Sequence, residues 1–180
     1  AAATRPTGAR SNRPSTGFPL PTPSQLSGWT AIPLNFLVML LMVGIGEEAG
    51  WMAFAAPRLL SGGRFLVAWA VLAAIRVLWH LPLMLSGSLP WNLGVGGNIA
   101  FQFLVLWLFA RSGGAWFLAA LWHATLNALS GLFFFQMVEG ADEARLGLLM
   151  TMGYALAAVV VLLADFGRTT RRTALRLGPA

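Results

Sequence analysis

Long runs of apolar residues alternate along most of this chain with short turns that contain Gly, Pro and Ser. A helix needs roughly 20 apolar residues to cross the hydrocarbon core of a membrane, and five segments approach that length. They run from about Trp29 or Ile32 to about Leu60, and then over Phe65–Leu85, Asn98–Ala110, Ala115–Val138 and Leu146–Phe166. The pattern predicts an all-α fold, a polytopic membrane helix bundle with about five transmembrane helices.

Both ends of the chain differ from this apolar middle. Residues 1–28 are rich in Pro, Ser, Thr and Arg and contain no long apolar run, which is typical of a disordered tail. Residues 167–180 are basic. We therefore expect a disordered N-terminal tail over residues 1–28, a helical membrane domain over residues 29–166 and a basic C-terminal tail over residues 167–180.

Composition supports a membrane protein and excludes several other classes. Of the 180 residues, 57% are hydrophobic and only 10% are charged, whereas about a quarter of a soluble domain is charged. The absence of cysteine excludes disulfides, thiolate metal sites and cysteine catalysis. The formal net charge of +6 comes from arginines near the termini and in short loops, without the interleaved aromatic residues of a nucleic-acid surface. We expect the lipid bilayer, and no nucleic acid, as a partner.

The positions of the arginines predict an orientation. On one side of the predicted bundle, the connections hold Arg58, Arg64 and Arg111, and the basic tail follows on the same side; the opposite connections hold only Arg145. Cytoplasmic loops carry the excess of positive charge in membrane proteins. We therefore expect an integral protein of a bacterial cell membrane with a cytoplasmic C-terminus.

Few ionisable residues interrupt the predicted spans, and each is a candidate for function because a charge inside a membrane is costly. They are Glu47, Glu48, Arg76, His80 and His123, accompanied by the amides Asn98, Gln102 and Asn127.

Three of these residues are expected at one depth. Glu47 lies 11 residues before Arg58, His80 lies 16 after Arg64, and His123 lies 12 after Arg111. At about 1.5 Å per residue, all three lie roughly 16–24 Å from the face that the arginines mark. His123 and Asn127 also share a helix face, because they are four residues apart. A common depth is what a shared site requires.

Two carboxylates, two imidazoles and an amide at one depth suit the hydrolysis of a bond. A carboxylate can take a proton from water, an imidazole can orient the water, and His and Asn donors can stabilise an oxyanion. Glu47, His80 and His123 would also bind a divalent metal such as zinc. Taken singly, each residue has a plainer interpretation as an interhelical hydrogen bond or a helix cap. Those interpretations do not account for the common depth.

The motifs around these residues resemble those of a known family. The stretches "EEAGWMAFAAPRL", "WHLPL" and "HATLN" are similar to the CPBP family of intramembrane proteases, which includes type II CAAX prenyl proteases and bacteriocin-processing or immunity (Abi) proteins. The resemblance implies an endopeptidase that cuts a membrane-embedded or lipidated protein or peptide, with or without a metal. Glu47 and His80 would then activate water, His123 and Asn127 would form the oxyanion hole, and Glu48 would be a supporting carboxylate.

Two positions depart from the family pattern. The arginine expected four residues after the second Glu is replaced by Met52, and the Phe expected four residues before His80 is replaced by Arg76. We predict that Arg76 takes over the role of the missing arginine and pairs with Glu48 or Glu47. Family members usually carry more helices before the Glu-Glu motif, so the sequence is that of a minimal member or of part of a longer one.

Two other functions remain open at this point. Met52 favours a catalytically impaired immunity or scaffold protein of the same fold. Glu47 and Glu48 are compatible with a small proton-coupled transporter, although the sequence lacks the paired halves of repeat-built transporters.

Overall fold

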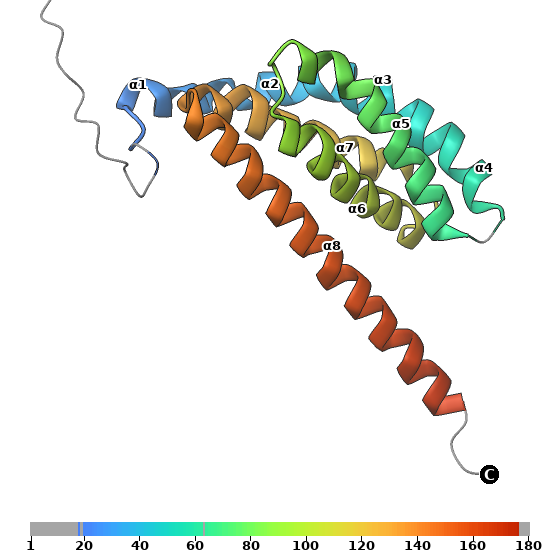
Figure 1. Cartoon of the computed structure of the whole chain (residues 1–180). Coiled ribbons are helices and arrows are strands. Elements are labelled where there is room, and N and C mark those ends of the chain that lie inside the picture. Colours follow the sequence, from blue (N-terminus) through green and yellow to red (C-terminus); the bar gives the residue numbers. More distant parts are fainter. Residues whose placement is uncertain (1–17, 19, 63, 177–180) are drawn as a thin grey trace, which may run out of the picture.

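The computed structural model describes residues 18, 20–62 and 64–176 (Figure 1). This part of the chain forms helices and connecting turns, without a strand. The α-helices are α1 (Pro23–Leu26), α2 (Ile32–Met39), α3 (Gly46–Glu48), α4 (Ala56–Leu60), α5 (Phe65–Leu85), α6 (Asn98–Arg111), α7 (Trp116–Leu129) and α8 (Ala141–Arg176). They are joined by the π-helical turns η2 (Leu40–Ile45), η3 (Ala49–Ala55), η4 (Leu93–Gly97) and η5 (Ser130–Phe134) and by the 3-10 turns η1 (Ser27–Ala31) and η6 (Phe135–Met137).

Four helical segments among the described residues are long and apolar enough to cross a membrane. They are Pro23–Leu60, Phe65–Leu85, Leu93–Arg111 and Ala141–Asp165. The predicted all-α polytopic bundle is therefore confirmed, with four such spans in place of the expected five.

The expected fourth span, Ala115–Val138, is not one of them. Its α-helical part is α7, with 14 residues. The segment also carries His123, Asn127 and Ser130, and beyond Leu129 it continues as the short turns η5 and η6. In place of the expected single helix over Ala115–Val138, the chain forms a shorter α-helix that continues as π-helical and 3-10 turns.

Helical structure extends into both ends of the chain. Helical structure begins at Pro23, inside the stretch expected to be disordered, where Thr22 and Gln25 form a capping box at the start of α1. Residues 1–17 and 19 of that stretch lie outside the described residues. At the other end α8 continues to Arg176.

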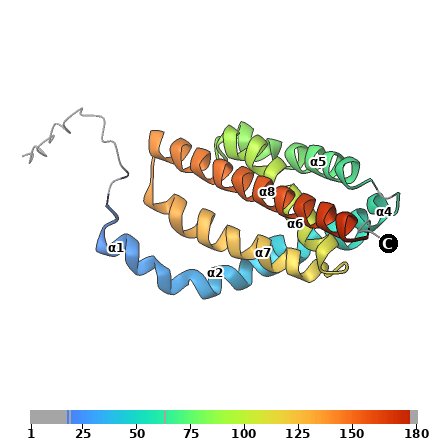
Figure 2. The same ribbon diagram turned by 90° about the horizontal axis from the view of Figure 1, so that it is seen from below.

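Successive passes of the chain run in opposite directions. The connections α4–α5 and α6–α7 lie at one end of the bundle, and the connections α5–α6 and α7–α8 lie at the other (Figure 1). Helix α7 packs against α2 and η2, and α8 packs against η4 and α6. Figure 2 shows α8 running between α5 and α7 when the molecule is seen from below.

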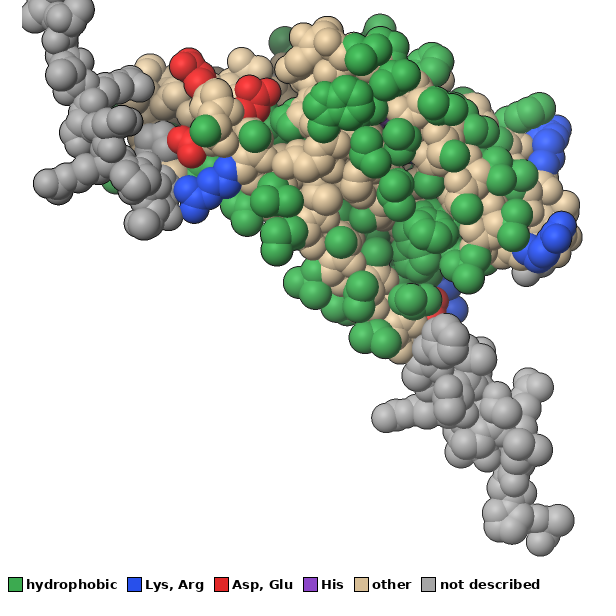
Figure 3. All heavy atoms as spheres, in the orientation of Figure 1, with side chains coloured by type: hydrophobic (Ala, Val, Ile, Leu, Met, Phe, Trp, Pro, Cys, Tyr) green, Lys and Arg blue, Asp and Glu red, His purple; other side chains and the backbone are tan. Residues whose placement is uncertain are grey.

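The surface is that of a protein in lipid. Figure 3 shows hydrophobic side chains over the middle of the visible face and charged side chains toward its ends. Large apolar side chains on α5 and α8 are more than half exposed, among them Leu66, Leu78, Leu156 and Leu163. Such an exposed apolar area is unusual for a soluble monomer and normal for helices that face lipid chains.

Small residues bring the first span close to α7. Ala119, Ala120 and Ala124 are buried on α7, and Gly44 is buried on η2. A Cβ atom added to Gly44 would lie 2.8 Å from the carbonyl oxygen of Ala120, closer than atoms pack. This small-residue contact, typical of membrane helix pairs, sets the Glu-Glu turn against the helix that carries His123.

Candidate active site

Three helices of the bundle supply the polar residues predicted to form a site. Glu47 and Glu48 lie in α3, a single α-helical turn with a π-helical turn on each side. Arg76 and His80 lie on α5, and His123 lies on α7. π-Helical turns are rare and occur often at functional sites, so the local structure around the two acids is itself unusual.

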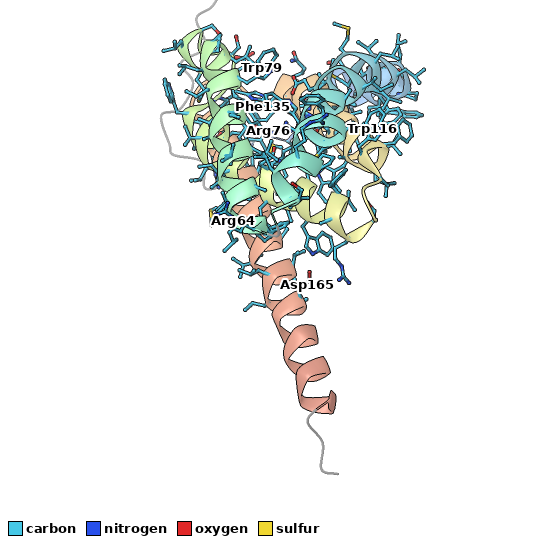
Figure 4. The ribbon with its side chains drawn as sticks, turned by 90° about the vertical axis from the view of Figure 1, so that its right-hand side faces the viewer. Arg64, Arg76, Trp79, Trp116, Phe135 and Asp165 are labelled. Atoms are coloured by element: carbon cyan, nitrogen blue, oxygen red, sulfur yellow. The ribbon has the colours of Figure 1, made fainter. Side chains whose placement is uncertain are left out.

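Arg76 and Glu48 form a buried ion pair. The Nη2 atom of Arg76 lies 2.8 Å from Oε1 of Glu48, and both side chains are fully buried. The Nη1 atom of Arg76 lies 3.9 Å from Oε2 of Glu47, which allows charge attraction without a direct hydrogen bond. The predicted pairing of Arg76 with the acids is therefore present, and Figure 4 shows Arg76 between Arg64 and Trp79, at mid-height in the bundle.

Gln102 holds the other side of the guanidinium. The Nε atom of Arg76 donates to Oε1 of Gln102 over 2.6 Å, and Gln102 is also buried. The two residues meet because Arg76 lies nine residues before the end of α5 at Leu85, and Gln102 lies nine residues after the start of the next span at Leu93. Equal distances from the connection place them at equal depth.

Met52 fills an apolar part of the same interior. Its side chain is fully buried and belongs to the core cluster that also contains Leu72, Phe101 and Val105. The position that carries an arginine in the resembled pattern is therefore a core position here, and the positive charge comes from α5.

Glu48 also orients His123. The Nδ1 atom of His123 lies 2.7 Å from Oε1 of Glu48. Because Arg76 holds Glu48 as a carboxylate that can only accept, Nδ1 of His123 donates this hydrogen bond. The other ring nitrogen, Nε2, is left for a further partner. The ring of Phe101 packs against the imidazole with 5.0 Å between the centroids.

His80 is fixed in a similar way. Its Nδ1 atom lies 2.9 Å from the carbonyl oxygen of Arg76, one turn earlier on α5. A carbonyl oxygen accepts hydrogen bonds only, so Nδ1 donates and Nε2 carries the lone pair of the neutral ring. Asn127 donates from Nδ2 to the carbonyl oxygen of His123 over 3.1 Å, which leaves the second hydrogen of that amide group available.

Glu47 is the less constrained of the two acids. Its Oε1 atom accepts a long hydrogen bond, 3.3 Å, from Nε1 of Trp79, and its side chain is 18% exposed. Its Oε2 atom is buried and has no hydrogen-bond partner within the described part of the chain. The same is true of one atom each of Glu48, Arg76 and Gln102, namely Oε2, Nη1 and Nε2. Several buried polar atoms around the ion pair therefore have no hydrogen-bond partner among the described residues.

A cavity of about 480 Å³ adjoins this cluster. His80, His123 and Asn127 line it, whereas neither Glu47 nor Glu48 does. The remaining lining is half apolar by residue count. It comprises Leu83, Leu89, Pro90, Leu93, Phe101, Leu126, Phe135 and Met150, together with Ser88, Gly97, Asn98, Ser130, Gly131, Gln136, Glu143 and Tyr154. The two imidazoles and the amide thus border a partly apolar cavity, and the carboxylates of Glu47 and Glu48 lie outside its lining.

The residues predicted as metal ligands do not converge. No group of three or more His, Asp or Glu side chains in the described residues is placed to hold a metal ion. Glu48 rather than Glu47 contacts His123. Nδ1 of each histidine has a partner within the protein, which leaves Nε2 as the nitrogen that a metal could bind. The predicted ligand set of Glu47, His80 and His123 is therefore not assembled as a metal-binding group among the described residues, and metal binding by these residues stays a prediction.

A model of the family described as type II CAAX prenyl endopeptidase Rce1-like matches residues 29–129, more than half of the chain. The chain belongs to this family. The resemblance predicted from the three motifs is thereby confirmed, and the chain is an integral membrane member of a protease family. The matched region contains all the residues predicted for the site and ends before α8. No curated protein and no solved structure matched the chain.

Within this Rce1-like chain, the structure adds partners that the motifs did not indicate. Trp79 contacts Glu47, and Gln102 contacts Arg76. Gln102 stood out as one of few polar residues in its span, and its depth relative to Arg76 was a usable signal. Trp79 carried no such signal, because tryptophan is common in membrane helices and its bond depends on the orientation of two side chains.

Proposed function

We propose that the chain is an intramembrane endopeptidase that uses water activated by a glutamate and a histidine. Its substrate is a membrane-associated protein or peptide, a class that includes prenylated and bacteriocin-like ones. The observation that carries the proposal is the cavity lined by His80, His123 and Asn127, with Glu48 hydrogen bonded to His123. Family membership supports the same reaction class.

The geometry favours different roles for the two acids. Glu48 already accepts from Arg76 and His123, so it is a poor base and a good positioning group. Glu47 has one carboxylate oxygen without a hydrogen bond, and its other oxygen accepts from Trp79, the neighbour of His80. In the proposed reaction, Nε2 of His80 accepts a proton from water in the cavity, and the carboxylate of Glu47 stabilises the resulting imidazolium.

The attack of this water on the substrate carbonyl would form an oxyanion. As the oxygen of water bonds to the carbonyl carbon, the carbonyl oxygen becomes negative, and Nδ2 of Asn127 has a hydrogen to donate to it. His123, which Glu48 orients, would contribute its second ring nitrogen, Nε2, beside Asn127. The C–N bond then breaks, and the leaving nitrogen takes up the proton that His80 received from water.

The non-catalytic alternative depended on the loss of the motif arginine. Arg76 now supplies a guanidinium to Glu48 from the neighbouring helix. No other observation favours an immunity or scaffold role, so the peptidase is the function that we propose.

The proposal includes an orientation. Arg58, Arg64 and Arg111 lie at the end of the bundle that holds the α4–α5 and α6–α7 connections (Figure 1). By the positive-inside rule that end is cytoplasmic, as is the C-terminus, and the membrane is that of a bacterial cell. The cavity-lining residues Ser88, Pro90 and Glu143 belong to the opposite end, so substrates would enter from the outer side.

Purified protein in lipid nanodiscs, incubated with a panel of apolar peptides, tests the proposal. We expect Glu47→Gln and His123→Ala to abolish cleavage, while Glu139→Gln, an exposed acid outside the cavity, leaves it intact. Cleavage that persists in both site variants would remove the proposed site. A parallel arm with a chelator distinguishes a metal-dependent from a metal-free reaction.

A further inference from the structure

One carboxylate, that of Glu143, lines the cavity. Apart from His80 and His123, Glu143 is the only ionisable acid or base among the described residues that form its lining, if the tyrosine is set aside. Glu143 lies in the first turn of α8 and is partly exposed. It makes no hydrogen bond or ion pair with another described residue. The carboxylate is therefore available to a ligand.

Glu143 lies far from the histidines along the cavity. Tyr154, on the same helix, marks the histidine end, because its ring packs on Phe101 at 6.1 Å and Phe101 packs on His123 at 5.0 Å. Glu143 precedes Tyr154 by eleven residues, which corresponds to roughly 16 Å along α8. An extended peptide covers that distance with about five residues.

Large apolar side chains contribute to the lining. They are Leu83, Leu89, Leu126, Phe135 and Met150, and they lie beside the polar residues Ser88, Asn98, Ser130 and Gln136. A peptide that fits would place apolar side chains there and a group complementary to a carboxylate at the far end. Such a group is a cation.

We infer that the site selects a peptide with an apolar stretch beside the scissile bond and a Lys or Arg about five residues from it, paired with Glu143. This inference rests on the proposed function. Helix α8 lies beyond the region that the family model matches, so the selectivity is a property of this chain's own last helix.

A structural role for Glu143 predicts a different result. Asp142 and Glu143 both lie in the first turn of α8, where acids interact favourably with the helix dipole. Only Glu143 lines the cavity. Asp142→Asn is therefore a matched control that removes the same kind of charge from the same turn.

The test measures binding of fluorescent peptides to the full chain in nanodiscs. The peptides share one apolar sequence and carry Lys, Gln or Glu at the chosen position, and in a second series at a position two residues nearer the apolar stretch. We expect wild type and Asp142→Asn to bind the Lys peptide about five- to tenfold more tightly than the Gln peptide, and the Glu peptide most weakly. Glu143→Gln should remove the preference without changing the thermal unfolding temperature.

Three results would overturn the inference: equal binding of all peptides by wild type, a preference that survives Glu143→Gln, or no binding of any peptide. Cleavage is scored in the same samples. A Glu143-dependent preference without cleavage would sustain the inference and contradict the proposed function. Cleavage that requires Glu47 but shows no preference for the cation would support the proposed function and contradict the inference.

Discussion

The guanidinium of Arg76 lies 2.8 Å from the carboxylate of Glu48, and neither side chain is exposed. Each charge alone would be costly in the interior of a membrane protein. Together with Gln102 and His123 they form a hydrogen-bonded network that joins α3, α5, α6 and α7. The sequence departs from the family pattern at Met52 and at Arg76, and the network shows how the second departure compensates for the first.

Replacing Arg76 by Phe should destabilise the protein and stop cleavage. The change leaves Glu48 buried without its cation, and breaking a buried pair in this way costs about 3–5 kcal/mol. Adding Met52→Arg should restore part of both losses, because it returns a guanidinium to the position four residues after Glu48. Thermal unfolding and peptide cleavage measure the two effects. A double variant no better than Arg76→Phe alone would show that the two positions are not interchangeable.

The two acids should respond differently to the same substitution. Glu48→Gln removes the charge that pairs with Arg76 and orients His123, so we expect a lower unfolding temperature together with lost activity. Glu47→Gln should lower kcat by at least about 10²-fold with little effect on stability, because Glu47 accepts only the long bond from Trp79. Equal destabilisation by the two variants would contradict this division of roles.

The close contact at Gly44 should tolerate no added carbon. We expect Gly44→Ala to destabilise the protein by about 1–3 kcal/mol, since its Cβ would lie 2.8 Å from the backbone oxygen of Ala120. Gly50→Ala is the matched control on the same span, where nothing lies within 4 Å of the new atom. If both variants unfold at the same temperature, η2 and α7 do not pack as closely as described.

Much of the helical layout was predictable from apolar runs and their turns. The bounds of α5 agree with the prediction because Gly- and Ser-rich turns delimit it on both sides. The third span begins five residues earlier than expected, at Leu93, since the glycines of η4 continue the helix as a π-turn instead of ending it. Glycine in a sequence does not distinguish these two outcomes.

Depth along the helices was predictable, and the partner of each side chain was only partly so. Counting residues from the arginines predicted one depth for Glu47, His80 and His123, and the missing motif arginine predicted the pairing of Arg76 with the acids. Counting gives no rotation about the helix axis, so it assigned Glu47, His80 and His123 to one metal site that is not assembled among the described residues. The place of Glu143 in the cavity could not be predicted from the sequence either, because it depends on how α8 packs against η4 and α6.

The orientation of the bundle can be tested with single cysteines, since the chain has none of its own. Ser61 and Ser88 are both exposed and lie in connections at opposite ends of the bundle. In intact cells we expect a membrane-impermeant thiol reagent to label Ser88→Cys and to leave Ser61→Cys unlabelled until the membrane is opened. The reverse pattern would invert the proposed topology and place the cavity entrance in the cytoplasm.

Hydrolysis in ¹⁸O-labelled water tests the central claim most directly. Purified wild-type protein is incubated with a peptide substrate, and the masses of the products are measured by mass spectrometry. The account predicts two fragments, one ¹⁸O atom in the newly formed C-terminal carboxylate, and neither fragment with Glu47→Gln. An intact peptide with wild-type protein, or the same labelled fragments with Glu47→Gln, would contradict it.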